Sequence, residues 1–163
     1  MPYCRVRALA AIRENKSLVE NGKWASGKMP RTAFPLSKTH AYSLGSGWRW
    51  LILGVEAGPR RYRLLVAYEK AKSQYRAWLG LASGSDQILL ARLEYHPSHR
   101  GWHCHLKRGE LTDVSCGVVK HPGDREHAKS CRQSSDLQVT DLDALAIALR
   151  VFRVEADAGG LFR

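Results

Sequence analysis

The sequence has few cysteines, no long hydrophobic run and a shortage of acidic residues. Its four cysteines are scattered over 163 residues with no Cys-x-x-Cys pair, which excludes a disulfide-stapled scaffold and predicts reduced thiols in a cytoplasmic protein. No apolar run approaches the roughly 20 residues of a membrane span, and no apolar stretch follows the charged N-terminus as it does in a secretory signal. We therefore expect neither a membrane protein nor a secreted one.

The shortage of acidic residues leaves a large positive charge. Lysine and arginine number 26 against 15 aspartates and glutamates, so the formal net charge is +11. Such an excess predicts a polyanionic partner, most simply DNA or RNA, and it would also suit an acidic protein within a larger complex. Residues 21–55 hold no acidic residue at all. This stretch is therefore the main candidate for contact with a polyanion.

Candidate nucleic-acid contacts follow from this distribution of charge. Trp24 stands among basic residues, where an aromatic ring could stack on an unpaired base; packing of the ring against the sheet is the alternative. Arg61 and Arg63 could bind phosphate, and a solvated strand face is the alternative. The full predicted set is Lys23, Trp24, Lys28, Arg31, Lys38, Arg61, Arg63 and Arg100.

Hydrophobic periodicity predicts an α+β fold in a single domain. From Trp48 to Lys107 apolar and polar residues alternate, and hairpin-length connections join the runs, which predicts a meander of about five antiparallel strands. Thr140 begins a Thr-x-x-Asp capping pattern before an apolar stripe that includes Leu142 and Leu145, which predicts a C-terminal helix. The predicted segments of the domain (1–163) are a helix at 1–20, a basic loop at 21–47, the meander at 48–107, an irregular Cys/His segment at 108–139, and a C-terminal helix and tail at 140–163.

Four of the seven histidines lie in one stretch of ten residues, 96–105, where the last two predicted strands meet. A hairpin with its loop at Pro97–Arg100 gives the register pairs His96–Gly101, Tyr95–Trp102, Glu94–His103, Leu93–Cys104 and Arg92–His105. The histidines then share one face with Glu94, while apolar pairs occupy the other. Two imidazoles and a carboxylate can bind a divalent cation, which would polarise a phosphodiester. Without a metal the histidines could act as general acid and base, and an inert surface cluster is the remaining alternative.

The stretch Arg92–Leu106 resembles the His-hydrophobic-His strand of the HUH endonucleases, a superfamily that includes rolling-circle replication initiators and plasmid relaxases. Glu94, Arg100-Gly101 and His103-Cys104-His105 follow the order found in the initiators. The resemblance implies that His103 and His105 are metal ligands of a catalytic site, with Glu94 or His96 as a third ligand. It also implies Mg²⁺ or Mn²⁺ as cofactor and an antiparallel sheet with flanking helices.

The same resemblance implies a tyrosine nucleophile, and the sequence departs from the family here. Initiators carry this tyrosine on a helix after the histidine strand, whereas no tyrosine follows Tyr95 in this chain. Relaxases carry it nearer the N-terminus, so Tyr3 and Tyr42 are the candidates by order. A frayed terminus and a loop aromatic are the respective alternatives.

A second group of metal-ligand residues follows the predicted meander. Its members are Cys116, His121, His127 and Cys131. Four such ligands could hold a structural Zn²⁺ that organises a polar segment, and a loop with incidental cysteines and histidines is the alternative.

The sequence thus supports three hypotheses. The first is a small metal-dependent nuclease with an HUH-like sheet. The second is a non-catalytic nucleic-acid-binding subunit or degenerate HUH-like domain. The third is a basic protein-interaction factor, such as an inhibitor from a mobile element.

Overall fold

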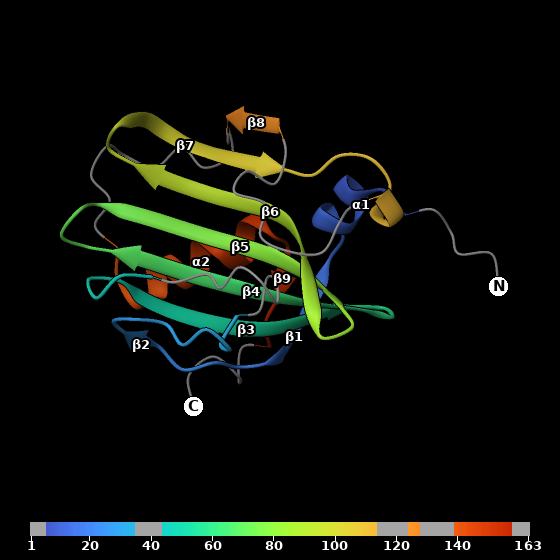
Figure 1. Cartoon of the computed structure of the whole chain (residues 1–163), viewed down its shortest axis with the longest axis horizontal. Coiled ribbons are helices and arrows are strands. Elements are labelled where there is room, and N and C mark those ends of the chain that lie inside the picture. Colours follow the sequence, from blue (N-terminus) through green and yellow to red (C-terminus); the bar gives the residue numbers. More distant parts are fainter. Residues whose placement is uncertain (1–5, 35–43, 114–123, 128–138, 158–163) are drawn as a thin grey trace.

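The computed structural model of the chain describes residues 6–34, 44–113, 124–127 and 139–157 (Figure 1). Within these residues one sheet of nine strands dominates a mixed α and β fold. The elements in chain order are α1 (Ala8–Arg13), β1 (Lys16–Glu20), β2 (Ala25–Ser26), β3 (Arg49–Ala57), β4 (Arg60–Glu69), β5 (Gln74–Ser83), β6 (Asp86–His96), β7 (His99–Leu106), the 3-10 turn η1 (Leu111–Asp113), β8 (Asp124–His127), α2 (Asp141–Val151) and β9 (Val154–Glu155).

The predicted meander is confirmed for β3 to β7, and the sheet extends beyond it on both sides. The spatial order is β8-β7-β6-β5-β4-β3-β1-β9, with β2 also paired to β3. Each pair from β3 to β8 is antiparallel, whereas β9 lies parallel to β1. The expected count of five strands is therefore too low, because short strands in the predicted helix, the basic loop, the irregular segment and the C-terminal tail join the same sheet.

The prediction of a helix over residues 1–20 is wrong for most of the part that the structure describes. The helix α1 covers only Ala8–Arg13, and Lys16–Glu20 forms β1. This strand pairs with both β3 and β9, so hydrogen bonds across the sheet outweigh the weak helical periodicity of the segment.

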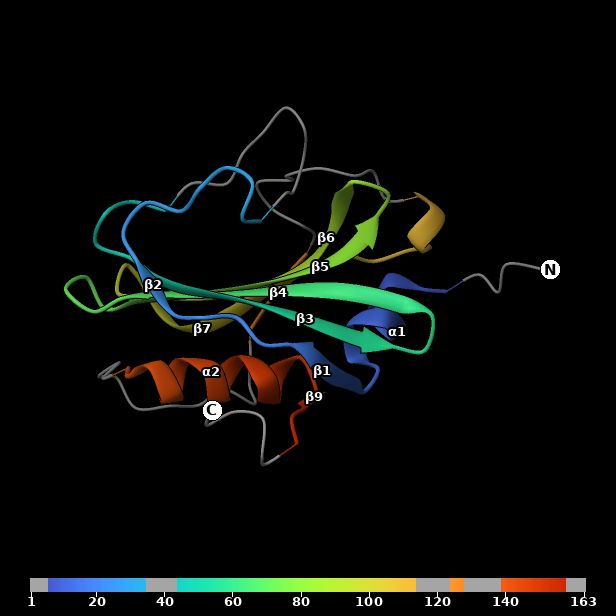
Figure 2. The same cartoon turned by 90° about the horizontal axis from the view of Figure 1, so that it is seen from below.

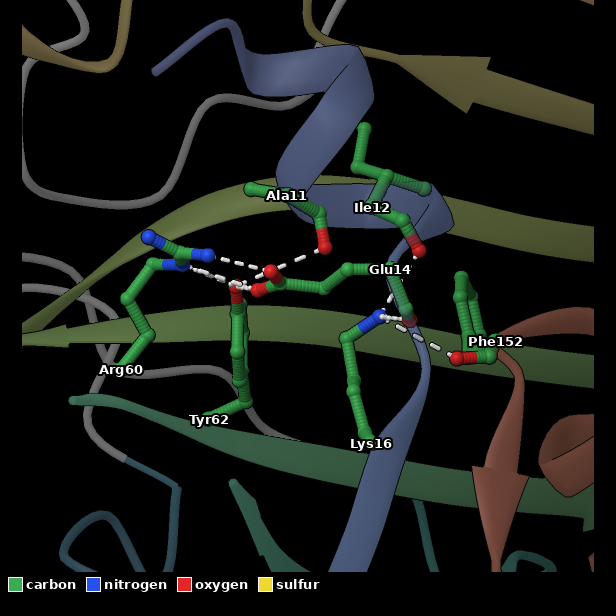
Figure 3. A network of polar contacts seen from close by, with 7 residues as sticks. All are labelled: Ala11, Ile12, Glu14, Lys16, Arg60, Tyr62 and Phe152. Carbon is green, nitrogen blue, oxygen red and sulfur yellow. Dashed lines mark hydrogen bonds and ion pairs between the residues drawn. The ribbon is translucent and has the colours of Figure 1, made fainter. Parts of the chain in front are cut away.

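The buried side chain of Lys16 closes the junction between α1, β1 and the end of α2 (Figure 3). Its Nζ donates hydrogen bonds to the carbonyl oxygens of Ile12, at 2.8 Å, Glu14, at 2.9 Å, and Phe152, at 3.2 Å. Ile12 lies in the last turn of α1 and Phe152 is the C-cap of α2. One ammonium group therefore satisfies carbonyls at the negative ends of both helices.

The helix α2 covers one face of the sheet, and α1 lies on the same side (Figure 2). The predicted capping box is confirmed, since Thr140 Oγ1 accepts from the Asp143 amide and the Asp143 carboxylate accepts from the Thr140 amide. Leu142 is 62% exposed, so its predicted place on the apolar stripe is wrong. The buried stripe of α2 instead consists of Ala144, Leu145, Ile147 and Ala148.

The opposite face of the sheet, which we call the second face, carries a smaller core. It is formed by Met29, Phe34, Leu44, Trp48, Leu65, Ala67, Trp78 and Leu89. Residues from the predicted basic loop thus pack against β4, β5 and β6, and Figure 2 shows this segment on the side of the sheet away from α2. The loop prediction is therefore too simple, because the segment contains β2 and contributes buried side chains.

Neither described helix is a candidate membrane span, as α1 has 6 residues and α2 has 11.

Candidate metal and phosphate site

The hairpin of β6 and β7 has the predicted register over most of its length. The pairs Arg92–His105, Leu93–Cys104 and Glu94–His103 are all observed. Near the turn the prediction is wrong, because His96 pairs with His99 and not with Gly101. The turn is shorter than expected, and β7 accommodates its extra residues in an irregularity at Gly101, whose φ of +84° favours glycine.

The two sides of this hairpin separate apolar from polar residues as expected. Leu93, Cys104 and Trp102 belong to the core beneath the helices, and the Tyr95 ring packs on Trp102 at 5.3 Å between centroids. Glu94, His103 and His105 are buried on the second face. The strand alternation therefore brings three buried ionisable side chains together.

Glu94 is the centre of this group. Its Oε2 lies 3.0 Å from His103 Nε2 and 3.5 Å from His105 Nε2. The rings of His103 and His105 meet edge to face at 5.4 Å between centroids. The predicted carboxylate and imidazole pair is therefore present as a contact.

Two arginines approach the same carboxylate. Arg92 faces both oxygens, with Nε 3.1 Å from Oε1 and Nη2 3.1 Å from Oε2. Arg76 Nε lies 3.5 Å from Oε1, and its guanidinium stacks over the ring of Trp48 at 5.1 Å. We call Arg76, Arg92, Glu94, His96, His103 and His105 the Glu94 cluster.

Sequence reasoning missed Arg76 as a member of this site. Arg76 is the register partner of Glu94 across β5 and β6. The signal lies in the alternation of β5, where Arg76 stands between the apolar Tyr75 and Ala77. Extending the hairpin pairing by one strand would have placed Arg76 beside Glu94.

The surroundings of Glu94 keep its carboxyl ionised. Burial favours the neutral acid, but the positive charges of Arg92 and Arg76, together with His103, outweigh burial. The pKa of Glu94 therefore lies below its ordinary value. Glu94 is thus an anion at neutral pH.

Three members of the cluster could hold a metal ion. Glu94, His96 and His103 each offer one ligand atom, and these atoms all lie within 4.8 Å of one another. His96 Nδ1 is hydrogen-bonded to Ser98 Oγ at 2.8 Å, which orients the ring as the outer hydrogen bond of a metal-binding imidazole does. His105, a predicted ligand, lies outside this group of three and contacts Glu94 instead.

The predicted nucleic-acid contacts occupy different surroundings. Lys23, Lys28 and Arg31 are exposed on the segment that leads onto the second face. Trp24 is half-buried and packs edge-on against Tyr68, at 5.7 Å between centroids, with Arg49 over its ring. This position agrees with the alternative in which Trp24 fastens its segment to the sheet.

Arg61 and Arg63 line a cavity of about 550 Å³ on β4. Glu20, Gly54 and Glu56 are also part of its wall. The wall of the cavity therefore combines both signs of charge.

Several predicted residues lie beyond the structural description. Lys38, Tyr3, Tyr42, Cys116, His121 and Cys131 fall outside the described residues. Arg100 belongs to β7, and His127 belongs to β8 as the register partner of His103. The proposed zinc set thus stays a prediction, with one of its members on a strand that adjoins the Glu94 cluster.

The four described tyrosines all belong to the opposite side of the sheet. Tyr62, Tyr68, Tyr75 and Tyr95 pack in or against the core that the helices cover. The hydroxyls of the first three bond to Glu14, Asp141 and the Ala144 carbonyl, respectively. None of these contacts involves the Glu94 cluster.

Comparison of the chain with family models, with curated proteins and with solved structures gives no match, so the resemblance of the β7 strand to the HUH endonucleases stays a prediction.

Proposed function

We propose that this protein is a small metal-dependent nuclease that hydrolyses phosphodiester bonds in DNA or RNA. The observation that carries the proposal is the group of Glu94, His96 and His103, whose ligand atoms lie within 4.8 Å of one another. A carboxylate and two imidazoles on one rigid hairpin suit a divalent cation. The basic segment that includes Lys28 and Arg31 packs on the same face of the sheet, where a polyanion would approach.

The donor set favours Mn²⁺ or Zn²⁺ over Mg²⁺. Two of its three atoms are imidazole nitrogens, whereas Mg²⁺ prefers oxygen ligands. The ion would supply a Lewis acid for a phosphate oxygen. His105, beside the same carboxylate oxygen, would hold Glu94 in position and exchange a proton with the reacting groups.

Water is the nucleophile that best fits this arrangement. The hydroxyls of Tyr62, Tyr68 and Tyr75 are engaged on the opposite side of the sheet. Tyr3 and Tyr42 remain candidates from the sequence. A water nucleophile leaves no covalent link between protein and nucleic acid, whereas a tyrosine leaves one.

The test combines metal content with cleavage. The wild-type chain, His96→Ala and His103→Ala are dialysed against Mn²⁺ and analysed for bound metal, then incubated with end-labelled single- and double-stranded DNA and RNA. We expect both variants to lose metal and cleavage, while Arg150→Ala, a change on the exposed face of α2, retains both. Cleavage that persists in both histidine variants would refute the proposal.

A non-catalytic nucleic-acid-binding module is the second candidate. It is favoured by Lys23, Lys28 and Arg31, which are exposed beside the second face and need no metal to contact phosphates. Binding would then fall steeply with salt and persist in a chelator, with no cleavage under any metal. Loss of binding in the chelator would count against this candidate.

A further inference from the structure

We propose that the cavity beside β4, on the second face of the sheet, binds a small zwitterion, a molecule of the size of a dipeptide with one ammonium and one carboxylate group. The cavity measures about 550 Å³, which lies within the usual range for small-molecule sites. This inference does not rest on the nuclease proposal, because it concerns other residues of the sheet.

The cavity is separate from the Glu94 cluster, although both lie on the second face. Strand alternation places Arg61 and Arg63 on the face that carries Ala67. Ala67 is the register partner of Arg76. Arg63 precedes Ala67 by four residues of β4, which corresponds to about 13 Å along the strand. The two sites can therefore be tested independently.

The first support is the separation of charge by strand in the cavity wall. The acidic members Glu20 and Glu56 belong to β1 and β3, whereas the basic members Arg61 and Arg63 both belong to β4. These strands are neighbours in the order β1-β3-β4 (Figure 1). The two charges of a ligand that spans one or two strand spacings, each of about 5 Å, would both meet the opposite charge. An extended dipeptide, about 7 Å long, has this span.

The second support is that the fold does not use these charges. Glu56 and Arg61 are register partners on β3 and β4. In the part of the chain that the structure describes, however, neither of them takes part in an ion pair or a side-chain hydrogen bond, and the same holds for Glu20 and Arg63. Two carboxylates and two guanidiniums at one cavity can therefore contact a ligand of mixed charge.

The third support is a buried acceptor without a donor at the border of the cavity. Gln87 is 2% exposed, and its Oε1 has no hydrogen-bond partner among the described residues. This oxygen lies over Gly80, 2.2 Å from the position of a Cβ added there. Gly80 is the register partner of the wall residue Arg63, and Gln87 is the register partner of the wall residue Ala82. A buried acceptor is normally satisfied, and an N–H group of a ligand would supply the donor.

The fourth support is the position that Gly54 gives to the Glu20 carboxylate. A Cβ added to Gly54 would lie 2.8 Å from the Cβ of Glu20 and 2.9 Å from its Oε2. The absence of a side chain at position 54 therefore lets Glu20 lie flat on the sheet. Gly54 is also the register partner of Arg63, so the carboxylate and the arginine occupy one row of the cavity wall.

Three dipeptides test whether both ligand charges are needed. Isotope-labelled full-length protein is titrated with alanylalanine, with its N-acetyl form, which has no ammonium, and with its C-terminal amide, which has no carboxylate. The amide NMR shifts of Gly54 and Gly80 report binding. We expect alanylalanine to bind about tenfold more tightly than either blocked form, because each block removes one charge-assisted contact. Equal affinities for the three probes, or no shift with alanylalanine, would overturn the proposal.

Variants matched to the probes locate each contact. We expect Glu20→Gln and Arg63→Gln each to weaken alanylalanine binding about tenfold. The exposed controls Arg150→Gln and Glu155→Gln should bind it as the wild type does. The N-acetyl form should not distinguish Glu20→Gln from wild type, and the amide should not distinguish Arg63→Gln, because one partner of each contact is already missing. A uniform loss of affinity for all three probes would contradict direct contact.

Ala82→Leu and Gln87→Met test the cavity itself. Ala82 is exposed in the wall, so a leucine should occupy part of the cavity and reduce the affinity for alanylalanine while the NMR spectrum remains that of the native fold. Gln87→Met keeps the length of the side chain and removes the unsatisfied oxygen. We expect it to weaken binding about threefold without lowering the melting temperature. Unchanged affinity in both variants would place the ligand elsewhere and overturn the proposal.

Inorganic phosphate distinguishes a zwitterion site from a simple anion site. Phosphate has no ammonium group, so we expect it to compete with alanylalanine only weakly at constant ionic strength. If phosphate shifts the Gly54 and Gly80 amides and alanylalanine does not, the cavity binds anions and the zwitterion assignment is wrong. These titrations use no metal and measure no cleavage, so their outcome is independent of the nuclease proposal.

Discussion

Glu94 and His103 face each other across β6 and β7, and the buried carboxylate oxygen Oε2 lies 3.0 Å from the imidazole Nε2. The same carboxylate contacts Arg92 and Arg76, so one buried anion holds three strands together through its side chain. Removing the charge of this anion would leave two guanidiniums facing a neutral group. The contact is therefore structural as well as a candidate for chemistry.

Glu94→Gln keeps the shape of the side chain and removes its charge. Because the change leaves buried cations without their counterion, we expect the free energy of unfolding to fall by about 3 kcal/mol. Urea unfolding followed by tryptophan fluorescence measures this loss. Glu155→Gln, at an exposed position of β9, should change the free energy by less than about 0.5 kcal/mol. Equal effects of the two changes would contradict the central role of Glu94.

The sequence predicts the Glu94 and His103 contact because both residues belong to one hairpin. Alternation indicates which residues share a face there, and a slip of one residue would put charged side chains of one strand opposite Leu93 or Cys104 on the apolar side. The irregularity at Gly101 is not predictable in the same way, since it depends on the length of the turn. The prediction of strand pairing is thus accurate away from the turn and wrong beside it.

Contacts between segments far apart in the chain cannot be predicted from local sequence patterns. Lys16 binds the Phe152 carbonyl across 136 positions of the chain, and no local pattern marks Lys16 as buried. The strand β1 shows the same limit, because its partners β3 and β9 come from the middle and the end of the chain. Such elements follow from the packing of the whole sheet.

The buried Lys16 predicts an unusual dependence of stability on alkaline pH. Burial lowers the pKa of Lys16 to about 8, despite the opposing charge of Glu14. The unfolded chain therefore binds more protons than the folded chain between pH 8 and the ordinary lysine pKa of about 10.4. The contribution of Lys16 to the free energy of unfolding should rise there by about 1 kcal/mol per pH unit.

Unfolding in urea at pH 7 to 9.5, for wild type and Lys16→Met, measures this contribution. The variant loses three hydrogen bonds and should be less stable at pH 7. The difference in free energy of unfolding between wild type and variant should rise with pH, because only the wild type contains Lys16. Above pH 10 the raised pKa values of Tyr62 and Tyr68 oppose further gain, because ionising either buried hydroxyl favours unfolding. If the stabilities of wild type and Lys16→Met change in parallel with pH below 9.5, the pKa of Lys16 is not lowered in the folded protein.

Asp141 fastens the start of α2 to the sheet. Its carboxylate accepts a bidentate contact from Arg49 and a hydrogen bond from the Tyr68 hydroxyl, and these donors lower its pKa. Since the folded pKa lies below the unfolded one, the stabilisation is present above about pH 4 and is lost as the pH falls through the folded value.

Asp141→Asn should reduce the free energy of unfolding at pH 7 by about 1 kcal/mol, a modest value because both charged partners are about one-third exposed. The difference from wild type should shrink toward pH 3. Denaturant titrations at the two pH values measure it, and Asp113→Asn, an exposed change in η1, is the control. A difference that does not depend on pH would show that the carboxylate charge is not involved.

Gly101 links the shape of the β6–β7 hairpin to the three candidate metal ligands Glu94, His96 and His103. Its φ of +84° lies in the left-handed region, and no atom lies within 4 Å of the Cβ that an alanine would add. Gly101→Ala therefore costs only backbone strain, about 1 kcal/mol. Relief of this strain shifts the irregularity that places His96 opposite His99, so we expect Mn²⁺ affinity to fall about tenfold while the fold persists.

Gly58→Ala is the matched control for this change. Gly58 also has a positive φ, +55°, and open space around its added Cβ, but it lies in the turn between β3 and β4. The two variants should lose similar stability in thermal unfolding, whereas only Gly101→Ala should lose metal affinity in a calorimetric titration with Mn²⁺. If both variants bind Mn²⁺ equally, metal binding does not depend on the Gly101 backbone.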